Sequence, residues 1–244
     1  MSENNELAGK VVLVTGASRG IGYAAGIEAA RRGAHVIAVA RTVGGLEELD
    51  DEIQKLGGSA TLVPLDLRDG DAVDRLGAAI FERWGHLDGL VANAGQLGVL
   101  SPVAHIKPDD FDKVLAVNVT ANYRLLRSVD LLLRQAEAGR AVFVSSSSAR
   151  SARPYWGLYA ASKAALDALV KSYAGEIVQT KVRANVFYPG AVRTALRAKA
   201  MPGENPETLP PPADIAPRLV DLLSPALDEQ GRLFDMETGR FEAL

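Results

Sequence analysis

A glycine-rich loop between a buried strand and a helix most restricts the fold of this chain. Residues 11–15, VVLVT, form an apolar run typical of a buried strand. The sequence GASRGIG, from Gly16 to Gly22, follows directly, and residues 21–32 have a helical pattern. Glycines let backbone N–H groups approach an anion, and the N-terminus of a helix favours negative charge. This order of elements predicts a phosphate site, with the spacing G-x-x-x-G-x-G instead of the commoner G-x-G-x-x-G.

The same alternation of strand and helix continues along the chain. Further strands are predicted over 35–40, 60–65, 87–92, 141–144, 182–187 and 232–235, and helices over 43–56, 70–84, 111–138, 159–180 and 214–223. Such alternation predicts a parallel sheet of about seven strands with helices on both faces, and ligands at the carboxyl ends of the strands. We find no linker, so residues 1–244 are expected to form one domain.

Residues 191–212 differ from the rest of the chain in composition. They contain Pro202, Gly203, Pro206 and the run Pro210 to Pro212. A segment of this kind is not expected to pack as core, and we predict that 191–212 is a mobile loop on the substrate side.

Composition excludes several classes of function. The net charge of the 244 residues is −3, so no basic face is expected for nucleic acid or for an anionic membrane. There is no cysteine, which excludes disulfides and thiol catalysis. The three histidines lack metal-site spacing, so no metal is expected. Residues 1–10 do not resemble a signal peptide and no run is long enough to span a membrane, so a cytoplasmic location is expected.

The stretch 141–169 carries the pattern of an acid–base site. Tyr159 and Lys163 are four residues apart, which places them on one face of a helix. An ammonium group beside a phenol favours the phenolate, so Lys163 is predicted to lower the pKa of Tyr159 from about 10. Ser146 stands at the end of the preceding strand, where its hydroxyl can bond the same substrate oxygen. A tyrosine and a lysine at this spacing also occur on many solvated helices, so the stretch alone does not establish catalysis.

The end of the second strand bears on the choice of dinucleotide. Many dinucleotide-binding folds place a carboxylate there for the ribose 2′-hydroxyl, whereas this chain has Ala40 and Arg41. Arg19, in the glycine loop, can reach the same place. Two guanidinium groups suit a 2′-phosphate, which favours NADP over NAD. The alternative is that Arg41 only begins a loop and that NAD is bound.

Three further polar sites stand out. Asp66 and the sequence Asn93-Ala94-Gly95 follow directly after predicted strands, where ligands bind in such folds. Asn118 lies inside an apolar helical pattern, where an amide is costly unless it is hydrogen-bonded. Asn118 is therefore expected to have a partner.

Taken together, these residues resemble the classical short-chain dehydrogenase/reductases over about residues 10–223. The matching segments occur in the family's order and spacing; they are TGASRGIG at 15–22, Asp66-Leu67, Asn93-Ala94-Gly95, Asn118, Ser146, YAASK at 159–163 and Pro189-Gly190 through Thr194. The chain departs from the family at its end, where LFDMETGRF at 233–241 replaces an Asp-Gly-Gly motif.

The resemblance implies a doubly wound Rossmann-type fold and a role for each matching residue. Tyr159 would be the general acid or base, Lys163 would lower its pKa and bind the nicotinamide ribose, Ser146 would hold the substrate oxygen, and Asn118 would hold a water of a proton relay. The cofactor would be lined by Gly16, Ser18, Arg19, Gly20, Ile21, Gly22, Arg41, Asp66, Leu67, Asn93, Ala94, Gly95, Pro189, Gly190, Val192 and Thr194.

The resulting prediction is an NADP(H)-dependent oxidoreductase that interconverts a ketone or aldehyde and an alcohol by hydride transfer. The resemblance also implies a homodimer or homotetramer. Three alternatives remain open: an NAD-linked alcohol dehydrogenase, a lyase or epimerase that uses the cofactor transiently, and a non-catalytic dinucleotide-binding sensor or scaffold. The substrate walls are expected from 96–102, 150–158 and 191–212, and Leu97, Tyr155 and Trp156 favour an apolar or aromatic site.

Overall fold

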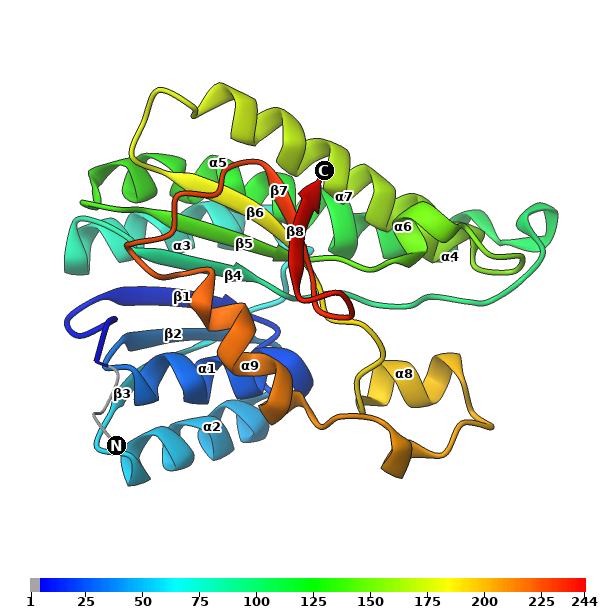
Figure 1. Ribbon diagram of the computed structural model, residues 1–244, viewed down its shortest axis with the longest axis horizontal. Helices are drawn as coiled ribbons and strands as arrows, with labels where there is room; N and C mark the ends of the chain where they lie inside the picture. Colours follow the sequence, from blue (N-terminus) through cyan, green and yellow to red (C-terminus); the bar gives the residue numbers. More distant parts are fainter. Residues whose placement is uncertain (1–4) are drawn as a thin grey trace.

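The computed structural model describes residues 5–244, and a single eight-stranded sheet organises them. The strand order is β3-β2-β1-β4-β5-β6-β7-β8 (Figure 1). Every neighbouring pair is parallel except the last, in which β8 runs antiparallel to β7. The strands are β1 (Val11–Thr15), β2 (His35–Ala40), β3 (Ser59–Pro64), β4 (Gly89–Ala92), β5 (Arg140–Val144), β6 (Arg183–Tyr188), β7 (Arg232–Asp235) and β8 (Arg240–Ala243).

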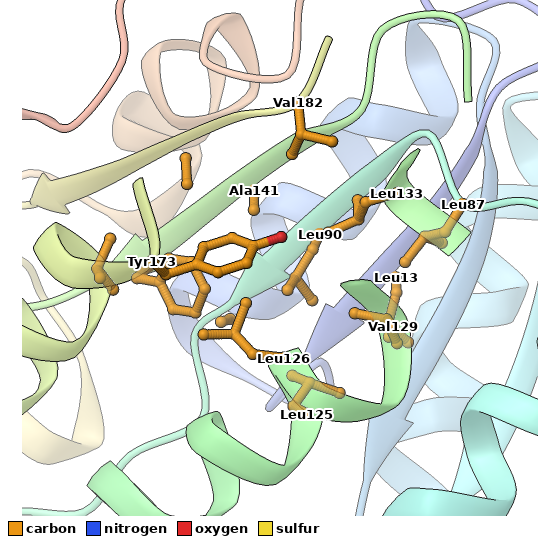
Figure 2. Close-up of a cluster of buried hydrophobic side chains, with 14 of the residues drawn as sticks. Leu13, Leu87, Leu90, Leu125, Leu126, Val129, Leu133, Ala141, Tyr173 and Val182 are labelled. Carbon is orange, nitrogen blue, oxygen red and sulfur yellow. The ribbon is translucent and has the colours of Figure 1, made fainter. Parts of the chain in front are cut away.

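Helices cover both faces of this sheet. Successive side chains of a strand point to opposite faces, so Leu13 of β1 packs in one apolar cluster and Val14 in another. The first cluster includes side chains of α3 (Gly70–Trp84), α5 (Ala121–Gln135) and α7 (Gly157–Glu176), and the second includes those of α1 (Gly20–Arg31), α2 (Val43–Lys55) and α9 (Pro212–Asp221). Figure 2 shows part of the first cluster, in which Leu13 and Leu90 lie near Leu125, Val129 and Tyr173.

The order of the strands places a ligand site. The chain runs outward from β1 to β3 and then crosses back to β4 on the other side of β1. In open α/β sheets, ligands bind at the carboxyl ends of the strands where the order reverses in this way. The loops after β1 and β4 therefore meet at the expected site. The doubly wound fold predicted from the sequence is confirmed.

The prediction of one regular helix over 111–138 is wrong in the middle of this range. It consists of α4 (Pro108–Leu115), a turn of π-helix labelled η2 (Ala116–Thr120) and α5. A π-helical turn holds one extra residue, and such turns are frequent at functional sites. Here the turn contains Asn118, which is fully buried. The interruption thus coincides with a predicted site residue.

The segment 191–212 also differs from its prediction. Val192 and Ala200 are buried, so part of the segment does pack. It contains α8 (Ala195–Ala200) and a short 3-10 helix, η3 (Pro206–Thr208). Arg197 forms an ion pair with Glu204 at 2.6 Å that closes the turn after α8. Figure 1 shows α8 beside the strand ends, apart from the packed helix layers. The mobility of 191–212 stays a prediction.

Three smaller elements were not predicted. Strand β8 forms a hairpin with β7 and adds an eighth strand to the seven expected. The others are α6 (Ser148–Ser151) and the 3-10 helix η1 (Val103–His105). No helix within residues 5–244 is long and apolar enough to cross a membrane.

Candidate active site

The glycine loop after β1 leads into a helix terminus that is free to bind an anion. Arg19 immediately precedes α1 with extended backbone, and its side chain makes no capping hydrogen bond. The first turn of α1 holds no acidic residue. The first N–H groups of a helix have no partner within the helix, and they attract negative charge. This end of α1 therefore fits a pyrophosphate.

Close packing of this loop on the loop after β4 gives the site its shape. Gly16 has a φ of +67°, and a Cβ atom on Gly22 would lie 2.4 Å from Nδ2 of Asn93. The Asn93 amide donates to the carbonyl oxygen of Thr15 at 3.0 Å. In return, Oγ1 of Thr15 accepts from the backbone N–H groups of Asn93 and Ala94 at 3.0 and 3.1 Å. Thr15 thus ties together the two loops at which the strand order reverses, a role that the sequence did not reveal.

Two exposed arginines lie in the loops after β1 and β2. Arg19 precedes α1 and Arg41 follows β2, and neither side chain has a hydrogen bond or ion pair within residues 5–244. Asp66 follows β3, and hydrogen bonds from Arg68 hold its pKa below the usual value. The charge of Arg41 adds to that effect on Asp66. Arg41 is therefore near Asp66, with its guanidinium group available to an anion.

The other residues predicted to line the cofactor lie in loops after strands or in the first turn of α1. Ser18 contacts the start of α2, where a Cβ on Gly45 would lie 2.6 Å from its carbonyl oxygen. Ile21 and Leu67 each pack partly buried against one of the two core clusters. After β6, the segment with Pro189, Gly190, Val192 and Thr194 reaches the glycine loop, since the Thr194 methyl group lies 3.6 Å from where a Cβ on Gly20 would be.

The opposite end of the site holds Ser146, Tyr159 and Lys163. Tyr159 and Lys163 come from the first turns of α7 and are 7% and 3% exposed. Nζ of Lys163 lies 5.9 Å from the centroid of the Tyr159 ring and donates to the carbonyl oxygen of Val144 at 2.8 Å. Ser146 stands two residues after Val144, and its hydroxyl lies near enough to Tyr159 to lower the pKa of the phenol. The structure thus brings the three predicted residues together.

Burial controls the protonation of this cluster. It raises the pKa of Tyr159 to about 12, against a smaller lowering by the hydrogen bond with Ser146. It also lowers the pKa of Lys163 to about 8. Both shifts favour the neutral form, because removal from water costs the charged form most. The pKa of Tyr159 is therefore raised, whereas the sequence predicted that it is lowered, because burial is the largest influence on it.

Asn118 has the partners that its burial requires. Its Nδ2 donates to the carbonyl oxygen of Gln96 and to Oγ of Ser162, both at 2.9 Å, and its Oδ1 accepts from the Gln96 N–H at 2.9 Å. The Ser162 hydroxyl donates to the carbonyl oxygen of Tyr159 at 2.7 Å. A Cβ on Gly95 would lie 3.4 Å from Oδ1 of Asn118 and 3.5 Å from Nζ of Lys163. Asn118 therefore lies next to the Tyr159–Lys163 pair.

Apolar side chains from three distant segments surround Tyr159. They form a small cluster made of Leu97 and Leu100 after β4, Trp156 before α7, and Leu196, Ala200 and Met201 in and after α8. The rings of Trp156 and Tyr159 meet edge to face at 6.2 Å between centroids. Tyr155 is not part of this cluster and is 60% exposed.

Comparison with known proteins agrees with this arrangement. The family model described as short chain dehydrogenase matches residues 10–205. The chain belongs to the short-chain dehydrogenase family. This short-chain dehydrogenase is 37% identical over 235 residues to the uncharacterized oxidoreductase YciK of Escherichia coli K12, covering 95% of this chain and 93% of YciK. It is 36% identical over 195 residues to versicolorin reductase of Emericella nidulans, covering 79% and 73% of the two chains. The predicted family and its oxidoreductase class are confirmed.

Solved structures show the same fold. A short chain dehydrogenase structure from Shigella flexneri, complexed with NADP, superposes on this chain with a TM-score of 0.92 at 36% identity, covering 96% and 99% of the two chains. Another, from E. coli CFT073 and complexed with NADPH, gives 0.89 at 36% identity, covering 95% and 98%.

Proposed function

We propose that this short-chain dehydrogenase uses NADP(H) to interconvert a ketone or aldehyde and an alcohol, with Tyr159 as the general acid in reduction and the base in oxidation. The observation that carries the proposal is the buried cluster in which the Tyr159 hydroxyl meets Ser146 beside Lys163. A carbonyl oxygen placed between the two hydroxyl groups would accept a hydrogen bond from each.

The residues present fit the cofactor. The uncapped terminus of α1 suits the pyrophosphate, and the loops after β3 and β4 suit the adenosine. The segment 189–194 and Lys163 suit the nicotinamide end. When bound, the cofactor supplies or accepts the hydride at the substrate carbon.

The protein's own groups would orient the substrate and move the proton. With a pKa of about 12, Tyr159 is protonated at neutral pH and can donate its proton to the carbonyl oxygen. Ser146 would hold that oxygen, and the ammonium group of Lys163 would stabilise the phenolate that forms. Asn118 would fix the helix turn that presents Tyr159, through Ser162. Acid catalysis of this kind contributes about 10²–10⁴-fold.

A preference for NADP(H) is expected to depend on Arg41. Replacing Arg41 with Ala should weaken NADPH binding about 10–100-fold, since a charge-assisted hydrogen bond contributes about 1.5–3 kcal/mol. The affinity for NADH, which lacks the 2′-phosphate, should stay unchanged. Fluorescence titration of wild type and variant with both cofactors measures this.

The exposed Arg127 on α5 provides a matched control for charge. Arg127→Ala should bind both cofactors as the wild type does. An equal affinity of the wild type for NADH and NADPH, unaltered by Arg41→Ala, would show that Arg41 does not read a phosphate and would favour the NAD-linked alternative.

The apolar cluster around Tyr159 supports an apolar substrate body. A ketone with an aromatic or long alkyl group would replace contacts that Leu97, Trp156 and Met201 now make with one another. Trp156→Ala should therefore lower kcat/KM for a naphthyl ketone about 10–100-fold, given the energy of burying one large side chain. Butanone, measured in the same variant, serves as the internal control and should change little. Equal losses for the two ketones would mean that Trp156 supports Tyr159 and does not bind substrate.

A further inference from the structure

A third titratable side chain on α7, after Tyr159 and Lys163, has no role in the proposed reaction. Asp167 comes one helical turn after Lys163, so both side chains lie on one face of α7. Asp167 is partly buried, and this burial raises the pKa of its carboxyl group above the usual value. The hydroxyl of Tyr188, from β6, donates to Oδ2 of Asp167 at 2.5 Å.

The other carboxylate oxygen has no such bond. Among residues 5–244, the buried side-chain polar atoms without a hydrogen-bond partner of good geometry are Oδ1 of Asp167 and Oγ of Ser145. The Ser145 hydroxyl nevertheless lies near enough to lower the pKa of Asp167. Ser145 comes between Val144, whose carbonyl oxygen accepts from Lys163, and Ser146. Asp167 therefore lies near the carboxyl end of β5, where the carbonyl oxygen of Val144 accepts the hydrogen bond from Lys163.

The charges around this carboxylate come from four elements. On α7 the neighbour is Lys163, and on α6 it is Arg150, which lies over the Tyr188 ring at 5.7 Å and forms an ion pair with Glu242. On β7, Asp235 acts on Tyr188. Lys163 and Arg150, both cations, favour the ionised form of Asp167, and the hydrogen bond from Tyr188 and the nearby Ser145 hydroxyl do the same.

Few groups near Lys163 favour its charged ammonium form. Its ammonium group donates to a neutral carbonyl group, and no carboxylate lies within ion-pair distance of it in the described part of the chain. Desolvation is the main influence on its pKa, and it disfavours the ammonium form. Asp167 is the charged group that acts in the opposite direction.

We propose that Asp167 is a positioning residue that keeps Lys163 in its ammonium form, acting as a partly buried counter-charge held in place by Tyr188. The inference rests on the proposed function, in which the Lys163 ammonium stabilises the Tyr159 phenolate. It adds a residue that acts through Lys163 and does not touch substrate. Arg150, tied to β8 through Glu242, connects this counter-charge to the C-terminal hairpin.

The test is a direct NMR titration of both groups in the cofactor-free protein. The side-chain ¹⁵Nζ of Lys163 and the ¹³Cγ of Asp167 are followed against pH, with Lys163→Met and Asp167→Asn providing the assignments. In the wild type, Asp167 should be ionised at every pH at which Lys163 titrates. In Asp167→Asn, the pKa of Lys163 should fall by about one pH unit or more, the effect typical of an opposite charge nearby. Asp167→Glu should restore it.

A second tyrosine–aspartate pair, between Tyr173 of α7 and Asp130 of α5, gives the matched control. The hydroxyl of Tyr173 donates to Oδ1 of Asp130 at 2.7 Å, and Tyr173 lies about 15 Å along the helix from Lys163. Asp130→Asn should leave the pKa of Lys163 unchanged. If it lowers that pKa as much as Asp167→Asn does, the effect is a general one of net charge and the proposal is overturned.

Two further results would overturn the proposal. One is an Asp167 that stays protonated above pH 7.5 in the wild type, a measurement that needs no folded variant. The other is a Lys163 pKa that is the same in Asp167→Asn and wild type. If the enzyme is active, kcat/KM should decrease at high pH as Lys163 loses its proton. In Asp167→Asn this decrease should begin at a lower pH, by as many pH units as the pKa of Lys163 falls. Failure of the wild type to turn over any carbonyl would contradict the proposed function, and it would be distinguishable because the titration uses neither cofactor nor substrate.

Discussion

Tyr159→Phe is expected to lower kcat about 10²–10⁴-fold, the contribution of a positioned general acid. The variant keeps the ring that packs against Trp156, Leu97 and Ala200, and loses only the hydroxyl group that meets Ser146. NADPH affinity should stay close to that of the wild type, because the phosphate end of the site lies on other loops. Steady-state kinetics with a reactive ketone and cofactor titration measure the two quantities.

Tyr155→Phe is the matched control for this variant. Tyr155 lies four residues earlier, is exposed and is outside the apolar cluster. Its loss of a hydroxyl should alter kcat by no more than about twofold, as is usual for an exposed side chain. Turnover by Tyr159→Phe comparable with that of Tyr155→Phe would remove Tyr159 from the chemistry.

Lys163→Met is expected to lower the activity while it raises the free energy of unfolding. Burial lowers the pKa of Lys163 from 10.5 to about 8. At about 1.4 kcal/mol for each pH unit, holding the ammonium group inside the protein costs about 3 kcal/mol at neutral pH. Methionine removes that cost and loses one hydrogen bond to Val144, worth about 1 kcal/mol. The free energy of unfolding at pH 7 should therefore rise by about 1–2 kcal/mol, while kcat/KM falls by about 10²–10³-fold.

The sign of the pH dependence is an independent check. The pKa of Lys163 is lower in the folded chain than in the unfolded one, so its destabilising contribution is full below about pH 8 and disappears as the pH rises to 10.5. The advantage of Lys163→Met should be full below pH 8 and should shrink as the pH rises from 8 to 10.5. Urea unfolding across this range measures it. A variant that is much less stable than the wild type at pH 7, by an amount independent of pH, would show that Lys163 is not held at an electrostatic cost.

The parts of the fold that the sequence predicts are those with a strong local signal. Strand β2 and helix α3 begin and end where expected, because each apolar pattern is bounded by a charged residue or glycine. The π-helical turn around Asn118 leaves no such mark, since its cause is the hydrogen bonding of Asn118 with Gln96 and Ser162. Strand β8 is short and polar, and its partner β7 is what makes it a strand.

The sequence predicts where the residues of the candidate site lie in the fold better than it predicts their protonation states. Residues after strands are placed by the topology alone, which is why the loops after β1 and β4 meet as expected. The direction of the pKa of Tyr159 depends on depth of burial, and a four-residue spacing does not reveal depth. Asp167 looks from the sequence like a solvated helix residue. In the structure it is partly buried, and its hydrogen-bond partner Tyr188 comes from a strand twenty-one residues later.

The central claim is that the protein transfers a hydride between NADP(H) and a carbonyl, with Tyr159 handling the proton. The most direct measurement is the ratio of alcohol formed to NADPH consumed, determined for an apolar ketone with wild type and Tyr159→Phe at equal cofactor saturation. We expect one alcohol per NADPH for the wild type, and formation of alcohol and consumption of NADPH that are both about 10²–10⁴-fold slower for the variant. Product formed without net NADPH consumption would instead indicate a lyase or epimerase, and NADPH binding with no product from any carbonyl would indicate a sensor.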